Sequence, residues 1–372
     1  MAYSLMEGNE AVAWGAFDAG CRFFAGYPIT PATSVYNTML RLLPPAGGIV
    51  LQGEDEIASM GYCLGASMCG YKAMTATSGP GISLYSEHIS FAIGSEIPLV
   101  IVNVQRLGPS TGSATRGADG DIQFMRWSNT GGLPVIVLAP VDAADCYTLT
   151  MHAFNLAETY RCPVFIASNK EIGLTRETVD LDLLERPPLG ERLQAPEGES
   201  YLPFRPAPGK EVPYFLPIGG GRISRQTSST HGENGYITTD PDEIAAQILR
   251  LERKLVSAVD EFSFHQADLQ DGAETLVLTF GVSARAARRA VREMREAGRA
   301  VSLLVLKTLW PVPEALIAEK ARGHKRVLVV EMNLGQYVRE VRRVLRDVEV
   351  DSLAQMNGVL IKPSQIKEAI GG

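Results

Sequence analysis

The sequence predicts an α/β protein in which a doubly wound N-terminal domain is followed by a smaller α/β domain. Short apolar runs alternate with stretches of helical spacing along most of the 372 residues, which is the pattern of parallel sheets covered by helices. The clearest run, Ile97–Val104, is continuously apolar, as expected of a strand covered on both faces of its sheet. Prolines and glycines accumulate between Arg176 and Gly235, so this stretch separates the two domains.

The first domain covers residues 1–175. We expect its strands at 21–25, 48–51, 71–76, 97–104, 133–138 and 163–167, and its helices at 9–18, 32–43, 56–69, 84–93 and 143–159. Pro28 and Pro31 exclude a helix from the loop that follows the first strand. Pro31 can instead occupy the first turn of the next helix, where its missing N–H is tolerated.

Residues 176–270 are expected to form a linker, or an excursion across a partner surface, that ends in a long charged helix at 241–260. The second domain covers residues 271–372, with strands at 275–280, 301–306 and 327–330. Ser283 is the expected N-cap of a helix at 285–296, and Gly298 ends that helix.

Composition limits the class of protein. A net charge of −7 gives no support for a nucleic-acid-binding face, which would need clustered basic residues. No apolar run reaches the length of a membrane span, and residues 1–7 lack the basic start of a signal peptide, so we expect a cytoplasmic protein. The five cysteines show neither a CxxC pair nor an iron–sulfur spacing, so we expect no disulfide framework, zinc site or cluster held by this chain alone.

Three carboxylates stand together at Glu54, Asp55 and Glu56, where a strand gives way to a helix. Acidic residues are favoured in the first turn of a helix, so capping alone can explain them. The following residues 57–67 carry no charge, however, which predicts a helix that is buried on all sides. A carboxylate at the buried start of such a helix needs a partner or a shifted pKa, and it is therefore a candidate for proton chemistry.

Other candidates follow neighbouring strands. Arg106 comes directly after the clearest strand, at the sheet edge where α/β proteins usually bind ligands, although a surface ion pair would also explain it. Ser110 and Thr111 lie in a loop kinked by glycine and proline, where turn chemistry and anion binding explain their hydroxyls equally well. The turn Ser78–Gly81 lacks a phosphate-loop motif and is by itself a weak signal for phosphate binding.

Taken together, these loops resemble the alpha subunit of the 2-oxoacid:ferredoxin oxidoreductases, and they are most similar to its 2-oxoglutarate branch. The resemblance covers nearly the whole chain. The matching motifs are Gly26–Pro31, Gly53–Glu56, Thr75–Gly81 and Gly108–Gly112 in the first domain, His231–Gly235 in the linker, and Lys307–Pro311 and Glu331–Gln336 in the second domain.

The resemblance implies a fold and a cofactor. The first domain would be the pyrimidine-side binding domain for thiamine diphosphate, and the second would be similar to the C-terminal domain of transketolase. Glu56 matches the catalytic glutamate that hydrogen-bonds the aminopyrimidine ring, and Tyr27 and Pro28 would contact the same cofactor. The resemblance implies no metal ligand in this chain.

The resemblance also implies where a substrate binds. Thr30 and Arg106 match residues that hold the carboxylate and carbonyl end of a 2-oxo acid, and Ser110 and Thr111 would line the same pocket. An arginine fork suits a carboxylate. After Gly112 the sequence departs from the pattern of the 2-oxoglutarate branch, because residues 113–121 lack its Pro-Thr pair and its glutamine. The identity of the 2-oxo acid therefore stays open.

The implied activity is the CoA-dependent oxidative decarboxylation of a 2-oxo acid, most simply 2-oxoglutarate to succinyl-CoA, or the reverse carboxylation, with electrons passing to ferredoxin. A separate beta subunit would supply the diphosphate side of the cofactor site, Mg²⁺ and a [4Fe-4S] cluster. A gamma subunit and a ferredoxin-like delta subunit would complete the enzyme. Two alternatives remain at this point, which are a thiamine enzyme subunit that does not use ferredoxin and a non-catalytic assembly subunit.

Overall fold

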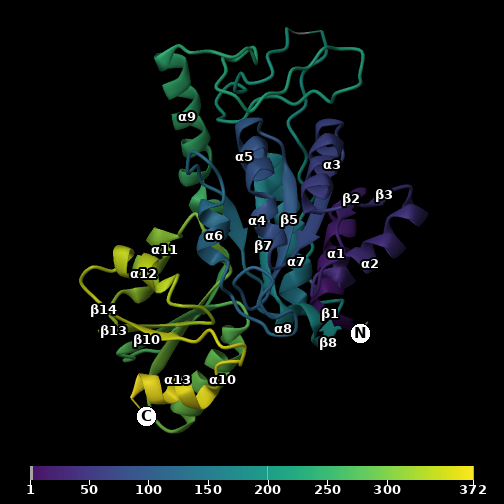
Figure 1. Ribbon diagram of the computed structural model, residues 1–372. Helices are drawn as coiled ribbons and strands as arrows, with labels where there is room; N and C mark the ends of the chain where they lie inside the picture. The colour runs from purple at the N-terminus through teal and green to yellow at the C-terminus, as the bar shows by residue number, and fades with distance from the viewer. Residues whose placement is uncertain (1–2, 199, 372) are drawn as a thin grey trace.

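A computed structural model describes residues 3–198 and 200–371. Met1 and Ala2, which belong to the stretch examined for a signal peptide, lie outside the described residues. The N-terminal domain is built on a seven-stranded sheet in the order β12-β6-β7-β5-β4-β2-β3 (Figure 1). Its strands are β2 (Phe23–Gly26), β3 (Ile49–Gln52), β4 (Ala73–Thr77), β5 (Leu99–Gln105), β6 (Ile136–Leu138), β7 (Pro163–Asn169) and β12 (Thr308–Trp310).

The helices of this domain cover both faces of the sheet, as the sequence predicted. They are α1 (Gly8–Asp18), α2 (Thr33–Leu42), α3 (Glu56–Met68), α4 (Gly81–Leu84), α5 (Ser86–Gly94), α6 (Ile122–Trp127), α7 (Ala143–Tyr160) and α8 (Lys170–Leu174), with a short 3-10 turn at Pro44–Ala46. Alternate residues of β5 face opposite cores: Val100 and Val102 pack into one buried cluster, and Leu99 and Ile101 into the other.

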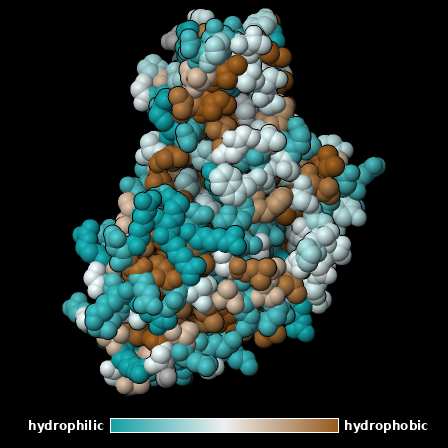
Figure 2. Space-filling view, turned by 60° about the vertical axis from the view of Figure 1, so that its left-hand side comes forward, coloured by the Kyte–Doolittle hydropathy of each residue, from teal (hydrophilic) through white to brown (hydrophobic). Residues whose placement is uncertain are grey.

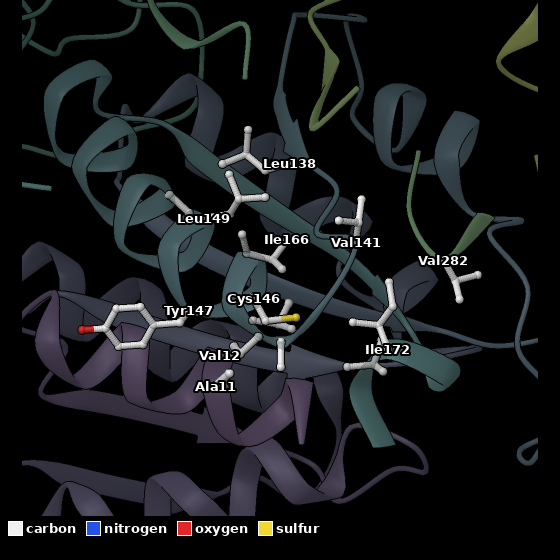
Figure 3. Close-up of a cluster of buried hydrophobic side chains, with 14 of the residues drawn as sticks. Ala11, Val12, Leu138, Val141, Cys146, Tyr147, Leu149, Ile166, Ile172 and Val282 are labelled. Carbon is white, nitrogen blue, oxygen red and sulfur yellow. The ribbon is translucent and has the colours of Figure 1, made fainter. Parts of the chain in front are cut away.

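The first of these clusters lies between the sheet and helices α1 and α7. Figure 3 shows Ala11 and Val12 of α1 close to Cys146 and Tyr147 of α7, with Ile166 of β7 above them. All five side chains are buried, which explains why the two helices pack along the sheet rather than over the linker.

The C-terminal domain has a five-stranded sheet in the order β14-β13-β10-β11-β9. Its strands are β9 (His265–Asp268), β10 (Thr275–Phe280), β11 (Val301–Leu306), β13 (Arg326–Glu331) and β14 (Glu349–Ala354), and its helices are α10 (Ser283–Glu296), α11 (Glu314–Ala321), α12 (Val338–Val344) and α13 (Pro363–Ile370). Only β9 runs antiparallel to its neighbour in this sheet.

The linker folds back over one end of the N-terminal domain, at the top of Figure 1. Its described residues between 181 and 240 contain neither helix nor strand, and α9 (Pro241–Val256) follows them. This helix is anchored by a buried ion cluster, in which Arg250 and Lys254 contact Glu96 at 2.5 and 2.9 Å. These cations outweigh the burial of Glu96 and lower its pKa to about 2. Figure 2 shows hydrophobic residues at the surface near the linker end of the molecule. Within the linker, Ile223 and Ile237 are exposed.

Several elements differ from the sequence predictions. Strands β1 (Tyr3–Glu7) and β8 (Arg176–Asp180) form a small antiparallel ribbon that was not predicted, because β8 is charged and both strands are largely exposed. Strand β12 was also missed, and it crosses from the C-terminal part of the chain to pair antiparallel with β6. The domains are therefore joined by a shared strand as well as by the linker.

Helix boundaries shift for local reasons. Helix α2 begins at Thr33, so Pro31 lies in the preceding loop and not in the first turn. Helix α9 ends at Val256, and a 3-10 turn at Val259–Phe262 follows it. Ser283 is the first residue of α10 rather than its N-cap, and its hydroxyl has no hydrogen-bond partner among the described residues.

The prediction that α3 is buried on all sides was wrong. Ile57 and Tyr62 are 47% and 46% exposed, and Gly65 is exposed beside them. One face of this helix packs on the sheet through Met60 and Leu64, while the other is uncharged and open. In the described part of the chain, no helix is both long enough and apolar enough to cross a membrane.

Candidate active site

Four loops meet at the carboxyl edge of the N-terminal sheet. They follow β2, β3, β4 and β5, which lie side by side and parallel in the order β5-β4-β2-β3. These loops carry Thr30, Glu56, Gly79 and Arg106. The carboxyl edge of a parallel sheet is where α/β proteins bind ligands, and the sequence placed its strongest candidates there.

Arg106 is the centre of this edge. Its side chain is only 5% exposed, and its Nη1 donates a hydrogen bond of 2.5 Å to the main-chain oxygen of Thr30. The guanidinium lies against Gly79, where a Cβ would stand 2.5 Å from Nε, so this position requires glycine. Burial lowers the pKa of Arg106, and the nearby carboxylates of Asp121 and Glu56 oppose that shift. Its Nε has no hydrogen-bond partner in the described residues.

The structure separates the three neighbouring carboxylates into different roles. Glu54 is exposed, whereas Asp55 caps α3 by accepting a hydrogen bond of 2.7 Å from the N–H of Ala58. Glu56 is only 5% exposed, and it lies so close to Gly81 that a Cβ there would stand 2.5 Å from Oε1. Helix capping therefore accounts for the carboxylate of Asp55. It does not account for the carboxylate of Glu56.

The environment of Glu56 favours its protonated form. Burial raises its pKa, and the neighbouring charge of Asp55 adds to this effect. The helix N–H of Glu56 itself and the cation of Arg106 act in the opposite direction. A carboxyl group that is buried, displaced upward in pKa and set against a glycine turn is suited to exchanging a proton with a ligand.

Two hydroxyls in the turn after β4 add to the polar character of the edge. Thr77 Oγ1 and Ser78 Oγ are buried without a partner among the described residues, as is Arg106 Nε. Buried polar groups normally find a partner, so three unpaired groups at one edge indicate space for a polar ligand. At the level of sequence this turn was only a weak signal, because its motif is short.

The remaining predicted residues are more peripheral. Tyr27 is exposed and Pro28 half-buried, both on the loop that carries Thr30. Ser110 and Thr111 are exposed at the tip of the loop after Arg106, and no hydrogen bond joins either side chain to Arg106. That loop is closed by main-chain hydrogen bonds of 2.8 Å from Leu107 to Arg116 and from Ser113 to Leu107.

Sequence reasoning missed a polar network beneath the site. Asn103 Nδ2 donates to Asp121 at 3.0 Å, and the N–H of Asp121 donates to Gln105 Oε1 at 2.9 Å. Asn169 Nδ2 donates to Asp119 at 2.7 Å. The available signal was the polar residues at the carboxyl ends of the otherwise apolar strands β5 and β7.

Metal and thiol chemistry find little support in the described residues. Within residues 3–198 and 200–371, no group of three or more His, Cys, Asp or Glu side chains is arranged to hold a metal ion. Four of the five cysteines are buried, and burial raises the thiol pKa of Cys21 and of Cys162 to about 12, so neither is a reactive thiolate.

Comparison with known proteins identifies the family of both domains. Residues 14–250 match the thiamine-diphosphate-binding family model of the pyruvate flavodoxin/ferredoxin oxidoreductases, and residues 273–366 match core domain II of pyruvate:ferredoxin oxidoreductase. The chain is 40% identical to the 2-oxoglutarate synthase subunit KorA of Methanothermobacter thermautotrophicus, over 98% of this chain and 97% of the relative. It is 34% identical to the ketoisovalerate oxidoreductase subunit VorB of the same organism, over 100% of this chain and 97% of the relative.

A solved structure agrees with these sequence relatives. The 2-oxoglutarate:ferredoxin oxidoreductase from Magnetococcus marinus, with 2-oxoglutarate, coenzyme A and succinyl-CoA bound, has a TM-score of 0.92 and 30% identity. The match covers 99% of this chain but 64% of that longer chain. With full-length relatives at 40% identity and family models over both domains, the chain belongs to the pyruvate flavodoxin/ferredoxin oxidoreductase family, as an alpha subunit of the 2-oxoacid:ferredoxin oxidoreductases.

Proposed function

We propose that this chain provides the pyrimidine side of a thiamine diphosphate site and, with partner subunits, catalyses the CoA-dependent oxidative decarboxylation of 2-oxoglutarate or the reverse carboxylation. The observation that carries the proposal is the buried Glu56 at the start of α3, packed against Gly81 and within the electrostatic reach of Arg106. The names of the two relatives refer to different 2-oxo acids. We therefore choose 2-oxoglutarate as the proposed substrate because the identity to the 2-oxoglutarate synthase subunit is higher.

The residues at this edge suit an aminopyrimidine. Such a ring presents alternating donors and acceptors, and the edge offers a carboxyl group at Glu56 together with the unpaired hydroxyls of Thr77 and Ser78. Gly81 has no side chain to occupy the space beside Glu56. Tyr27 and Pro28, on the adjoining loop, would contact the same ligand.

Glu56 would exchange a proton with the ring nitrogen during turnover, and its raised pKa favours the form of the carboxyl group that holds the proton. The chemistry that thiamine diphosphate supplies when bound is a nucleophilic carbon that takes up the electrons left when a 2-oxo acid loses CO₂. Because the side chain is buried against the Gly79–Gly81 turn, water has little access to it, and its proton exchange is directed towards the ligand.

Arg106 would bind the carboxylate of the 2-oxo acid. Its Nη1 is engaged by Thr30, whereas Nε and Nη2 donate to no described residue, and a guanidinium suits a carboxylate. The Thr30 hydroxyl is free of this contact and would bind the same end of the substrate. Ser110 and Thr111, on the exposed loop, would line the pocket from its rim.

The partners proposed from the family pattern are a beta subunit with Mg²⁺ and a [4Fe-4S] cluster, a gamma subunit, a ferredoxin-like delta subunit and ferredoxin, in the cytoplasm. The open face of α3 is the surface where the beta subunit would dock. It is uncharged, and the helix that bears it begins at Glu56, so a subunit bound there would also enclose the site.

The proposal is tested by purifying the chain with its native partners and assaying 2-oxo acids for CoA-dependent reduction of a low-potential dye, with and without thiamine diphosphate. Activity on 2-oxoglutarate that needs cofactor and partners is the expected result. Activity on ketoisovalerate alone would correct the substrate. Turnover without any iron–sulfur partner would favour the ferredoxin-independent alternative, and no turnover with all partners present would favour a non-catalytic assembly subunit.

A further inference from the structure

The segment Arg116–Gln123 lies between the candidate site and the C-terminal domain. On the site side, it is joined to the ends of β5 and β7 through Asp121 and Asp119. It also continues directly from the closed loop that carries Ser110 and Thr111, because Leu107 donates its main-chain N–H to the oxygen of Arg116 at 2.8 Å. The segment is thus fixed to strand β5, which Arg106 directly follows.

On its other side, the same segment is held by the turn that follows β13. Gln336 Nε2 donates to the main-chain oxygen of Gly120 at 2.6 Å, and Gln336 Oε1 accepts the N–H of Gln123 at 3.1 Å. Asn333 Nδ2 donates to the oxygen of Asp119 at 3.0 Å, while the N–H of Asp119 donates to Met332 at 2.8 Å. Gln123 Nε2 also donates to the main-chain oxygen of Gln336 at 3.1 Å. Five hydrogen bonds therefore tie one short segment to one turn, two of them through the Gln336 side chain.

The turn itself is rigid. Glu331 is fully buried and accepts the N–H groups of Tyr337 and Val338 at 2.8 and 3.0 Å. Asn333 Oδ1 accepts the N–H of Gln336 at 2.9 Å, which fixes the direction of the glutamine side chain. The C-terminal domain also contacts the start of the 116–123 segment at Gly358. A Cβ at this glycine would stand 2.8 Å from the side chain of Arg116.

We propose that Gln336 and Asn333 are positioning residues, through which the C-terminal domain holds the 116–123 segment and thereby fixes Arg106 and the loop of Ser110 and Thr111 for binding of the 2-oxo acid. This inference rests on the proposed role of Arg106. It assigns to the C-terminal domain an indirect part in substrate affinity, although none of its residues belongs to the candidate site. Gln336 and Asn333 would affect substrate binding only through the 116–123 segment that they hold.

The test is Gln336→Met in the assembled enzyme, which keeps the side-chain volume and removes both hydrogen bonds. We expect the KM for the 2-oxo acid to rise about fivefold or more, while kcat and the KM for CoA stay within about twofold, because two hydrogen bonds of ordinary net strength are lost at a distance from the reacting atoms. Hydrogen exchange should become faster in residues 116–123 and stay unchanged in β4.

Gln365 provides a matched control. Its side chain also accepts one main-chain N–H, from Lys362 at 2.9 Å, and donates one hydrogen bond, to Gln355 at 2.9 Å, but both partners lie within the C-terminal domain. Gln365→Met should reduce thermal stability and leave both KM values unchanged. Asn333→Asp is the second variant. It keeps the acceptor for Gln336, removes the donor to Asp119, and places a second carboxyl group beside the buried Glu331.

Two results would overturn the inference. An unchanged KM for the 2-oxo acid in both Gln336→Met and Asn333→Asp would show that the contacts do not reach the site, and unchanged exchange in residues 116–123 would show that they do not hold the segment. An Arg106→Lys variant separates this failure from that of the proposed function. If Arg106→Lys raises the KM and the turn variants do not, only the positioning role is wrong; if Arg106→Lys has no effect, the substrate role of Arg106 itself is wrong.

Discussion

Arg106 is bound to the main-chain oxygen of Thr30 and not to its hydroxyl, at a distance of 2.5 Å. The arginine therefore fixes the loop after β2 regardless of the side chain at position 30, and the Thr30 hydroxyl stays available to a ligand. The sequence assigned these two residues to one pocket. Their link uses neither the Thr30 hydroxyl nor Arg106 Nε, and Nε has no hydrogen-bond partner among the described residues.

The first prediction concerns the arginine. Arg106→Lys keeps the charge but loses the planar fork of the guanidinium. The KM for the 2-oxo acid should therefore rise about tenfold or more. This is the effect expected when a charge-assisted hydrogen bond of about 1.5–3 kcal/mol is lost. Steady-state kinetics of the assembled enzyme measure it. Arg253→Lys is the control, because Arg253 is exposed and pairs only with Glu211. An unchanged KM would reduce Arg106 to a structural contact of the Thr30 loop.

The second prediction concerns Glu56. Glu56→Gln preserves shape and removes the ability to exchange a proton, so turnover should fall by roughly 100-fold or more, as expected for loss of general acid–base catalysis. Thermal stability should not fall, because a buried carboxyl with a raised pKa is replaced by a neutral group. Glu54→Gln, two residues away and exposed, should behave as the wild type. Full turnover in Glu56→Gln would argue for the non-catalytic assembly subunit.

The third prediction concerns the glycine beside that carboxyl group. A methyl group at Gly81 would stand 2.0 Å from Thr77 Oγ1 and 2.5 Å from Glu56 Oε1, so Gly81→Ala must displace both side chains. We expect turnover to fall at least tenfold and stability to fall by about 1–3 kcal/mol, a typical consequence of overpacking. Gly220→Ala is the comparison, because its nearest neighbour would be 3.9 Å away. If Gly81→Ala keeps wild-type turnover, the close approach to Glu56 has no catalytic importance.

The sequence was sufficient for the elements with strong periodicity. Residues 97–104 identify β5 because a continuous apolar run of that length suits few other structures. Residues 57–67 identify α3 because charge is absent over about three turns. Thr308–Trp310 could not be recognised as a strand of the first sheet, since its only sheet partner is β6, about 170 residues earlier in the chain. Short strands acquire their structure from tertiary contacts, which local sequence does not encode.

The same distinction applies to the site. Glu56 and Arg106 could be selected because acidic and basic residues stand out at the ends of apolar strands. That Asp55 rather than Glu56 caps α3, and that Asp119 and Asp121 form the network beneath Arg106, depends on side-chain directions fixed only in three dimensions. The exposed face of α3 was missed for another reason: an uncharged helix was taken as buried within its own chain.

The fourth prediction concerns that exposed face. At Gly65 a Cβ would meet nothing within 4 Å, so Gly65→Glu should leave the isolated chain folded. A charge on the uncharged face should nevertheless weaken association with the beta subunit, which co-purification and size-exclusion chromatography would measure. Gly221→Glu, also in open space but on the linker, is the control. Undiminished association of Gly65→Glu would place the subunit contact elsewhere.

The last prediction concerns pH and Asp119. Burial raises the pKa of this carboxyl group to about 7, the hydrogen bond from Asn169 opposes the shift, and the charges of Glu331 and Asp121 add to it. Because the pKa in the folded state lies above the ordinary aspartate value of 3.8, the folded state binds more protons than the unfolded state between about pH 4 and 7. The free energy of unfolding should therefore fall as pH rises through this range and level off above pH 7.

The contribution of Asp119 to this fall is at most about 4 kcal/mol, since three pKa units correspond to roughly that energy. Asp119→Asn keeps the acceptor for Asn169 and removes the charge, so the variant should be more stable than the wild type at pH 8 and show a flatter profile between pH 5 and 8. Glu331 also has a pKa raised by burial, and a residual slope should therefore remain. Urea unfolding at a series of pH values measures both curves. Parallel curves would mean that Asp119 is already ionised at pH 5. The charged form would then be stabilised by the start of α10, where Gly281 lies against Oδ2 of Asp119.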